Sequence, residues 1–174
     1  MMNDERRMTN RRIRVGRTDV FVHELPDNLE EIMFTEQQRA FLDAQRVGRL
    51  ATADAAGQPH VIPVCYACDN AAVYIALDAK PKRVAPPHLK RVRNVLENPQ
   101  VALVVDRYSD DWSELAYVLI RGTARLIQPE DATHQYAVML LRQRYVQYQT
   151  MPIHEQPMIM IEPQSVVVWG AVGG

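Results

Sequence analysis

The feature that most constrains the fold is a series of short apolar segments, each bounded by turn residues, in the chain after Gln45. Segments 46–53 and 60–68 are separated by a turn that contains Gly57, which predicts a β-hairpin. Strands and helices do not alternate as they do in a parallel α/β sheet. We therefore predict a mainly β fold, an antiparallel barrel of six or seven strands with helices on its outside. The remaining strands are expected over 72–77, 101–105, 117–127, 158–161 and 165–169.

Three helices are predicted to interrupt this series of strands. Thr35 followed by Gln38 fits a capping box, which predicts a helix over 35–45. Prolines at or before the first turn predict further helices over about 88–97 and over 129–148. One stripe of the last helix is expected to consist of Ala132, Tyr136, Met139, Leu140 and Gln143.

The length of 174 residues is enough for one domain with an arm. The stretch 1–17 is polar and contains six arginines, which favours a tail or an arm across a partner subunit, and 18–25 is a candidate strand. We therefore expect an arm and connector over 1–33 and the folded domain over 34–174. No aromatic residues alternate with the arginines, so nucleic acid is not an expected partner.

The sequence also indicates where the protein works. It has no apolar run of the roughly 18 residues that a bilayer span needs and no apolar signal core at its N-terminus, so we expect a soluble cytoplasmic protein without a membrane partner. Cys65 and Cys68 are then expected to be reduced, with thiols on opposite faces of a strand. The five histidines show no ligand spacing, and no metal site is expected.

A net charge of -1 conceals a basic segment over 80–93 that contains no acidic residue and all three lysines of the chain. Lys80, Lys82 and Arg83 follow a predicted strand and precede a predicted helix, so these cations gather at one end of the sheet. Guanidinium and ammonium groups together suit a phosphate, and a solvated basic loop is the alternative. The basic residues are Lys80, Lys82, Arg83, Lys90, Arg91 and Arg93.

Three further residues invite a functional interpretation. Pro63 interrupts the predicted strand 60–68, and its missing N–H places this strand at an edge, at a bulge or beside a ligand. Trp112 lies in an acidic turn that is either a solvent loop pinned to the body or a wall over a planar ligand. Trp169 raises the same question, and core packing is the more common role.

Two long segments carry a resemblance to a known family. GRLATADAAGQPHVIPVCYACDNAAVYIALDAKPKR resembles the split-barrel flavin and deazaflavin oxidoreductases, the superfamily that includes pyridoxamine 5'-phosphate oxidase. LKRVRNVLENPQVALVVDRYSDDWSEL is similar to the branch of probable F420-dependent enzymes. The resemblance spans about 34–169. It implies an antiparallel split β-barrel of the FMN-binding type and a homodimer that holds coenzyme F420 or FMN in a groove between two barrels.

The resemblance also implies a set of site residues. The cofactor ring would lie against the second strand, and the phosphate would meet the basic residues after the third strand. Trp112 and Trp169 would line the groove from the same or the partner subunit. Ala116 and Tyr117 stand where relatives often have paired tryptophans, so no substrate preference is carried over. The implied cofactor-binding residues are Thr52, Val61, Ile62, Pro63, Val64, Lys80, Lys82, Arg83, Lys90, Arg91, Trp112 and Trp169.

The implied activity is hydride transfer between the cofactor and a small organic substrate. The cofactor carries this chemistry, so no catalytic side chain is required. The alternative is a flavin or deazaflavin carrier or sensor without turnover, which predicts the same phosphate residues. A haem-degrading split barrel is less well supported, because no single histidine stands out as an iron ligand.

Overall fold

The computed structural model describes residues 9–15, 18–24, 34–77 and 89–173. The chain divides into two compact units, 1–31 and 32–174. The described part of the first unit is an antiparallel hairpin of strands β1 (Thr9–Val15) and β2 (Thr18–Glu24). The strand expected over 18–25 is therefore confirmed. Strand β1 was not expected, because its arginine-rich sequence lacks the alternation of a half-buried strand.

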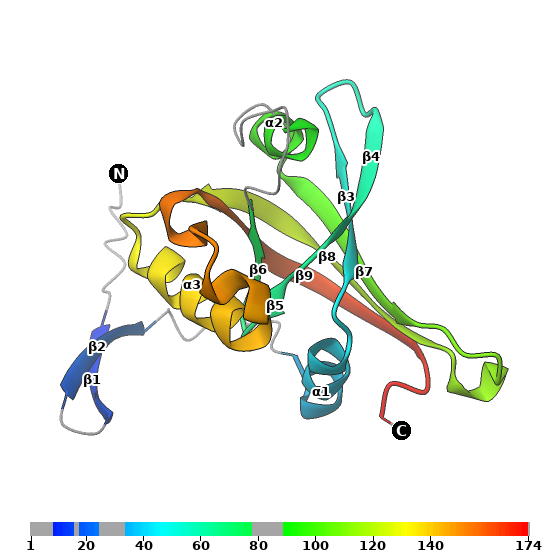
Figure 1. Cartoon of the computed structure of the whole chain (residues 1–174), viewed down its shortest axis with the longest axis horizontal. Helices are drawn as coiled ribbons and strands as arrows, with labels where there is room; N and C mark the ends of the chain where they lie inside the picture. The colour runs from blue at the N-terminus through cyan, green and yellow to red at the C-terminus, as the bar shows by residue number, and fades with distance from the viewer. Residues whose placement is uncertain (1–8, 16–17, 25–33, 78–88, 174) are drawn as a thin grey trace, which may run out of the picture. The chain divides into compact units, whose positions relative to one another are not determined.

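The second unit contains three α-helices and seven strands within its described residues, and the helices lie outside the sheet (Figure 1). The helices predicted over 35–45 and 88–97 are confirmed, and Thr35 and Gln38 form the expected capping box. The elements are α1 (Glu36–Ala44), β3 (Gly48–Ala53), β4 (Pro59–Val64), β5 (Ala67–Cys68), β6 (Val73–Ala76), α2 (Lys90–Glu97), β7 (Gln100–Arg107), β8 (Ala116–Ile127), α3 (Ala132–Arg144) and β9 (Met158–Gly170), with short 3₁₀ helices η2 (Trp112–Glu114), η3 (Val146–Gln149) and η4 (Ile153–Glu155).

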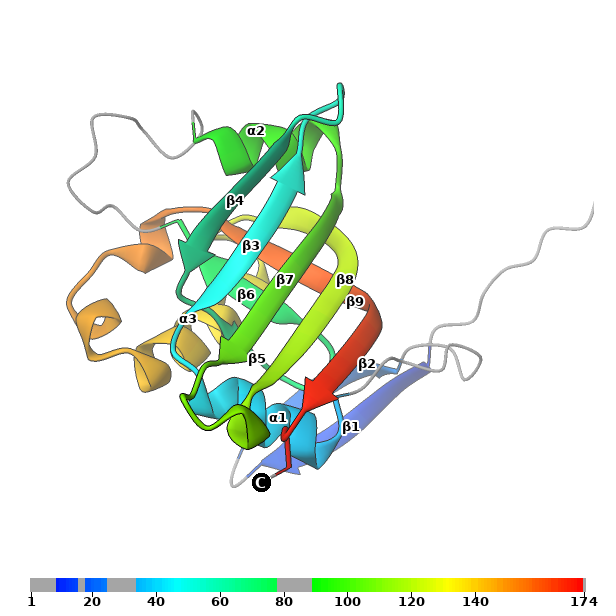
Figure 2. The same ribbon diagram turned by 90° about the vertical axis from the view of Figure 1, so that its right-hand side faces the viewer.

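The seven strands of this unit form one antiparallel sheet in the order β4-β3-β7-β8-β9-β6-β5. This confirms the predicted mainly β fold with antiparallel strands and flanking helices. The long antiparallel pair of β8 and β9 joins the two halves of the sheet, because β7 pairs with 116–123 of β8 and β6 pairs with 158–161 of β9. Figure 2 shows the resulting curled half-barrel. Its two edge strands, β4 and β5, are connected by Cys65 and Tyr66 alone.

The bend in the long β8–β9 pair depends on Gly122. The pairing of β8 with β9 shifts by one residue here, since Arg121 faces Ser165 and Gly122 faces Pro163, which leaves Gln164 as the extra residue of a bulge. A Cβ atom on Gly122 would lie 2.1 Å from the carbonyl oxygen of Glu162. Glycine therefore permits the close approach of the two backbones at the corner of the barrel.

Two apolar clusters lie on either side of the sheet. The larger cluster fills the inside of the curl and includes Leu50, Leu103 and Ile120, all fully buried. The smaller one lies between α3 and strands β5 and β6, where Tyr74 and Leu141 pack. The two cores explain why the short strand β6 is buried along its whole length.

Side chains at the end of α3 hold the point where the barrel passes from β4 to β5. The hydroxyl of Tyr145 accepts a hydrogen bond from the backbone N–H of Tyr66 (3.0 Å) and lies 2.8 Å from the carbonyl oxygen of the same residue. Arg144 donates to the carbonyl oxygens of Leu42 (2.8 Å), Asp43 (3.0 Å) and Gln45 at the C-terminal end of α1. Tyr145 thus replaces the strand partner that the Tyr66 backbone lacks, and Arg144 binds carbonyls that have no backbone partner at the end of a helix.

Three sequence expectations need correction. The strand expected over 60–68 is two strands, because the chain leaves one sheet edge at Val64 and enters the other at Ala67. The separate strands expected over 158–161 and 165–169 are one strand, β9, which continues through its bulge. The helix expected over 129–148 is shorter, since α3 ends at Arg144 and η3 follows.

The predicted stripe of α3 was also wrong. The helix buries His134, Ala137, Val138 and Leu141, whereas Tyr136 and Met139 are exposed. The buried positions follow the i, i+3, i+4, i+7 spacing of a core-facing helix, but two of them are small or polar. The prediction was wrong because it assigned the large apolar residues Tyr136 and Met139 to the buried side of the helix.

The close approach at Gly122 can be tested by the substitution Gly122→Ala. The added methyl group would overlap the Glu162 carbonyl and force the β8–β9 bend open, which should lower the free energy of unfolding by about 3 kcal/mol. Denaturant titration measures this loss. The control Gly57→Ala should cost only about 1 kcal/mol, from its φ of 80°, because nothing lies within 4 Å of the added carbon. Equal losses for the two variants would contradict the close-approach argument.

The role of the Tyr145 hydroxyl can be tested by Tyr145→Phe. The substitution leaves the ring in place but removes the hydrogen-bond partner of the buried Tyr66 N–H, which should lower the free energy of unfolding by about 2 kcal/mol. Tyr136→Phe is the matched control on the exposed side of α3 and should change it by less than about 0.5 kcal/mol. Denaturant midpoints that agree for the two variants would refute this role.

Candidate functional site

Strand β4 lies at an edge of the sheet, which is one of the three positions that Pro63 left open. Its side chains alternate along the strand: Pro59, Val61 and Pro63 are exposed, whereas Val64 is buried and Ile62 packs against the larger core cluster. The four residues expected to contact the cofactor ring therefore do not share one face. Val61, with 60% of its surface exposed, and Pro63 form an apolar strip on the outer face of the sheet.

The next strand, β3, brings Thr52 to the base of helix α2. The Thr52 side chain is buried, and its hydroxyl accepts a hydrogen bond from the Asn94 amide nitrogen (2.9 Å) and donates to the carbonyl of His60 (3.4 Å). The amide oxygen of Asn94 is completely buried and has no hydrogen-bond donor in the described parts of the chain. Sequence reasoning missed Asn94, and its one signal was a polar residue between the buried Val92 and Val95 of α2.

Helix α2 also carries two of the predicted phosphate residues. The Lys90 ammonium lies 2.7 Å from a carboxylate oxygen of Asp54 in the turn after β3. This hydrogen bond, together with backbone N–H groups of the turn, lowers the pKa of Asp54. Arg91 is half-buried beside Lys90. The other predicted phosphate residues, Lys80, Lys82 and Arg83, lie outside the described residues.

Neither tryptophan lies on β4 or on its neighbour β3. Trp112 belongs to η2, which follows β7, whereas α2 precedes β7, so the two helices lie at opposite ends of that strand (Figure 2). Trp169 lies on β9, which three strands separate from β4, and stacks on Tyr117 with ring centres 5.7 Å apart. Trp112 is 77% exposed and Trp169 is 53% exposed, so the core-packing interpretation of Trp169 was wrong. One chain does not bring these rings to β4.

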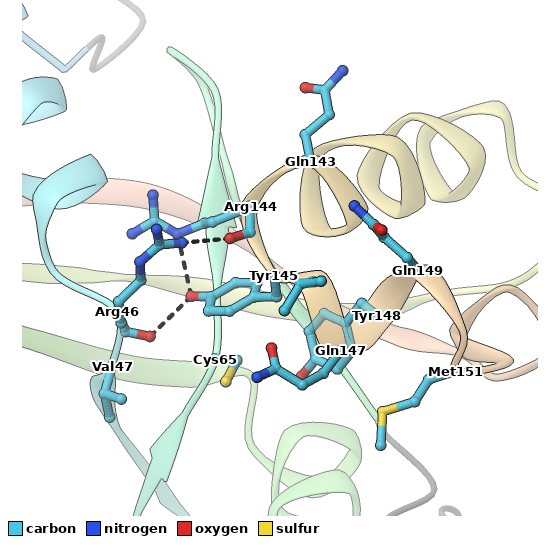
Figure 3. A pocket seen from close by; sticks show the side chains of 11 residues that line it. Arg46, Val47, Cys65, Gln143, Arg144, Tyr145, Gln147, Tyr148, Gln149 and Met151 are labelled. Carbon is cyan, nitrogen blue, oxygen red and sulfur yellow. Dashed lines mark hydrogen bonds between the residues drawn. The ribbon is translucent and has the colours of Figure 1, made fainter.

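A pocket of about 680 Å³ opens beside the link between β4 and β5 (Figure 3). Arg46 and Val47, which precede β3, form one wall, and the half-buried Cys65 lies between this wall and the end of α3. The segment 143–149 and Met151 complete the lining. Sequence reasoning missed the pocket, because its walls come from three distant parts of the chain and one of them was expected to be helix.

The two cysteines differ in environment, but they do not lie on one strand as predicted, since Cys65 belongs to the link after β4 and Cys68 to β5. Cys68 belongs to the larger core cluster, whereas Cys65 packs against the smaller one and lines the pocket. Burial raises the pKa of the Cys68 thiol to about 11. Both thiols are free, and no group of three His, Cys, Asp or Glu side chains with metal-binding geometry occurs among the described residues.

The difference between the thiols predicts selective alkylation. At pH 8 iodoacetamide should label Cys65 and spare Cys68, because a thiol with a pKa of about 11 is ionised in only about one molecule in a thousand and is also buried. Mass spectrometry of peptides identifies the labelled residue. Cys65→Ser should abolish labelling of the folded protein, whereas Cys68→Ser should leave it unchanged. Fast labelling of Cys68 in the native state would show that the inner thiol is accessible.

Within the described residues, no helix is both long and apolar enough to span a membrane.

The family model of pyridoxamine 5'-phosphate oxidase matches residues 34–170. A 5a,11a-dehydrotetracycline/5a,11a-dehydrooxytetracycline reductase of Streptomyces rimosus is 31% identical over 141 residues, which cover 80% of this chain and 85% of the relative. Together these two matches support an oxidoreductase role.

Solved structures share the fold. A heme storage protein from Vibrio cholerae superposes with a TM-score of 0.61 at 16% identity, over 75% of this chain and 92% of its own. An FAD-binding protein from Mesorhizobium loti gives a TM-score of 0.53 at 25% identity, over 74% of this chain and 87% of its own. The predicted split barrel is thus confirmed, and the chain belongs to the pyridoxamine 5'-phosphate oxidase family of flavin-binding split-barrel proteins.

Proposed function

We propose that this protein is an oxidoreductase that transfers a hydride between coenzyme F420, or FMN in its place, and a small organic substrate. The observation that carries the proposal is the edge position of β4, where Pro63 has no backbone N–H to donate and Val61 exposes an apolar surface. When bound, the cofactor supplies a ring that accepts or delivers the hydride. The chain positions that ring on the outer face of β4 and offers it backbone groups that no neighbouring strand uses in the described sheet.

The cofactor phosphate is assigned to Lys80, Lys82 and Arg83, with support from Lys90 and Arg91. The structural support comes from α2, which places the Lys90 ammonium beside the turn that follows β3. Asp54 shares that ammonium, so Lys90 alone is a weak phosphate ligand, and the proposal depends on the three earlier cations.

Thr52 and Asn94 are not assigned to the cofactor. The Thr52 side chain lies on the inner face of β3 with Leu50, on the side of the sheet opposite to Val61 and Pro63, and only 4% of its surface is exposed. The amide oxygen of Asn94 is also completely buried and has no donor within the described residues, which costs about 1–3 kcal/mol. A cofactor ring on the outer face of the sheet therefore does not meet these two side chains.

We also propose that two copies of the chain form the complete site. The outer face of the sheet exposes Val61, Val167 and Trp169, together with the Arg49–Asp106 ion pair. A twofold dimer buries such a face against itself, since the patch contains both charges and apolar groups. In such a dimer, Trp112 and Trp169 of one subunit can lie against β4 of the other subunit. Within a single chain, these two rings do not lie on β4.

A carrier without turnover is the alternative, because a heme storage protein shares this fold. A reduced-cofactor assay separates the two functions. An oxidoreductase reoxidises the bound reduced cofactor when its substrate is added, whereas a carrier leaves the cofactor reduced with every acceptor tried.

Fluorescence titration with coenzyme F420 and with FMN tests the proposed cofactor. One of them should bind, and replacing Lys80, Lys82 and Arg83 with alanine should raise its Kd by about a thousandfold or more, at 1.5–3 kcal/mol for each hydrogen bond to a charged group. Replacing Arg11, Arg12 and Arg14 with alanine removes the same charge elsewhere and should leave the Kd nearly unchanged. Unchanged affinity in the folded first variant would refute the phosphate assignment.

A further inference from the structure

We propose that the pocket beside Cys65 is the substrate site and that it takes an uncharged, flat aromatic molecule rather than a phosphorylated amine. The inference rests on the proposed function, because it assigns a substrate to that oxidoreductase. Cys65 directly follows β4, so the pocket begins one residue beyond the strand proposed to carry the cofactor ring. A volume of about 680 Å³ is large enough for a ligand of several fused rings.

The charges of the pocket argue against a phosphate. Of the two arginines in its lining, Arg144 is largely buried and donates to three backbone carbonyls and to the Asp43 carboxylate (3.2 Å). Arg46 is exposed, donates to the carbonyl of Arg144 and lies over the Tyr145 ring at 5.9 Å. A phosphate dianion requires several cations that are free to turn toward it. Within the described lining, the one guanidinium with spare donors is partly engaged and open to water.

The apolar and aromatic lining suits a flat ring system. Tyr145 and Tyr148 form one wall and pack edge to face with ring centres 5.4 Å apart. Both tyrosines are largely buried, and the Tyr145 hydroxyl is occupied by the Tyr66 backbone, so this wall offers the pocket no free polar group of Tyr145. At the rim, Val47 is 42% exposed and Val146 is 69% exposed. An aromatic ligand would cover both valines and remove their apolar surface from water.

The polar groups that remain are neutral. Gln143, Gln147 and Gln149 lie around the pocket with amides that both donate and accept, and Cys65 adds a weakly polar thiol (Figure 3). Amides of this kind match the carbonyl and hydroxyl substituents of a neutral ring system without demanding a charge. Met151 completes the wall with a flexible side chain that adjusts to ligands of different outline.

The experiment uses acridone, a neutral fluorescent tricycle with one carbonyl and one N–H. It is titrated into the protein both free of cofactor and saturated with F420 or FMN, and its fluorescence is recorded. We expect saturable binding with a Kd on the order of 10 µM in both forms. Acridone should also slow the alkylation of Cys65 by iodoacetamide. Pyridoxamine 5'-phosphate at about 1 mM should leave both the fluorescence and the alkylation rate unchanged.

Two matched variants locate the binding. Val146→Asp places a carboxylate at the pocket rim and should weaken acridone binding by about tenfold or more. Leu96→Asp makes the same kind of change on α2, at a residue that is also 69% exposed but lies outside the pocket, and should change the Kd by less than about twofold. Protection of Cys65 in the unaltered protein provides the test of location if Val146→Asp does not fold.

Three results would overturn the inference: no saturable acridone binding, displacement of acridone by pyridoxamine 5'-phosphate, or displacement by the cofactor itself. The last result would make the pocket the seat of the cofactor ring. Failure of the proposed function is separate, because it appears as the absence of F420 and FMN binding while acridone still binds to the cofactor-free protein.

Discussion

The hydrogen bonds between the Tyr145 hydroxyl and the backbone of Tyr66 are the contact on which the rest of the structure depends. The two edge strands of the half-barrel, β4 and β5, are neighbours in sequence but lie at opposite ends of the sheet. The residues between them have no strand partner, so their buried polar groups need side-chain partners. Tyr145 provides these, and Arg144 does the same for carbonyls at the C-terminal end of α1. The end of α3 therefore holds the junction of the two barrel halves.

That junction determines what each edge of the sheet can do. Strand β4 ends at Val64, two residues before the backbone groups that Tyr145 binds. Its outer side presents Val61 and Pro63, and Lys90 of α2 binds Asp54 in the turn that precedes it. The chain then passes Cys65 and opens a pocket under the same tyrosine. The apolar strip of β4 thus ends at Pro63, and the pocket begins two residues later at Cys65. This adjacency suits hydride transfer, which needs a ring and its reaction partner in contact and little side-chain chemistry.

Much of the positive charge in the described region is structural. Lys90 is paired with Asp54, and Arg144 with backbone carbonyls and Asp43, so these cations hold helices and turns to the barrel. An arginine in a pocket lining is therefore not by itself evidence for an anionic ligand. Membership of a family named for a phosphorylated substrate does not transfer that substrate, because the charges available in the pocket differ from those that such a substrate requires.

The amino-acid sequence by itself determined the features that depend on neighbouring residues: the capping box at Thr35, the hairpin around Gly57, the antiparallel strand pattern and the edge position of Pro63. It failed where contacts between distant segments decide the outcome. The buried side of α3, the orphan oxygen of Asn94 and the pocket shared by Arg46, Cys65 and Tyr145 were settled only by tertiary structure. The physical reason is that turn and cap preferences act over a few residues, whereas burial and hydrogen-bond satisfaction depend on which segments the closed barrel brings together.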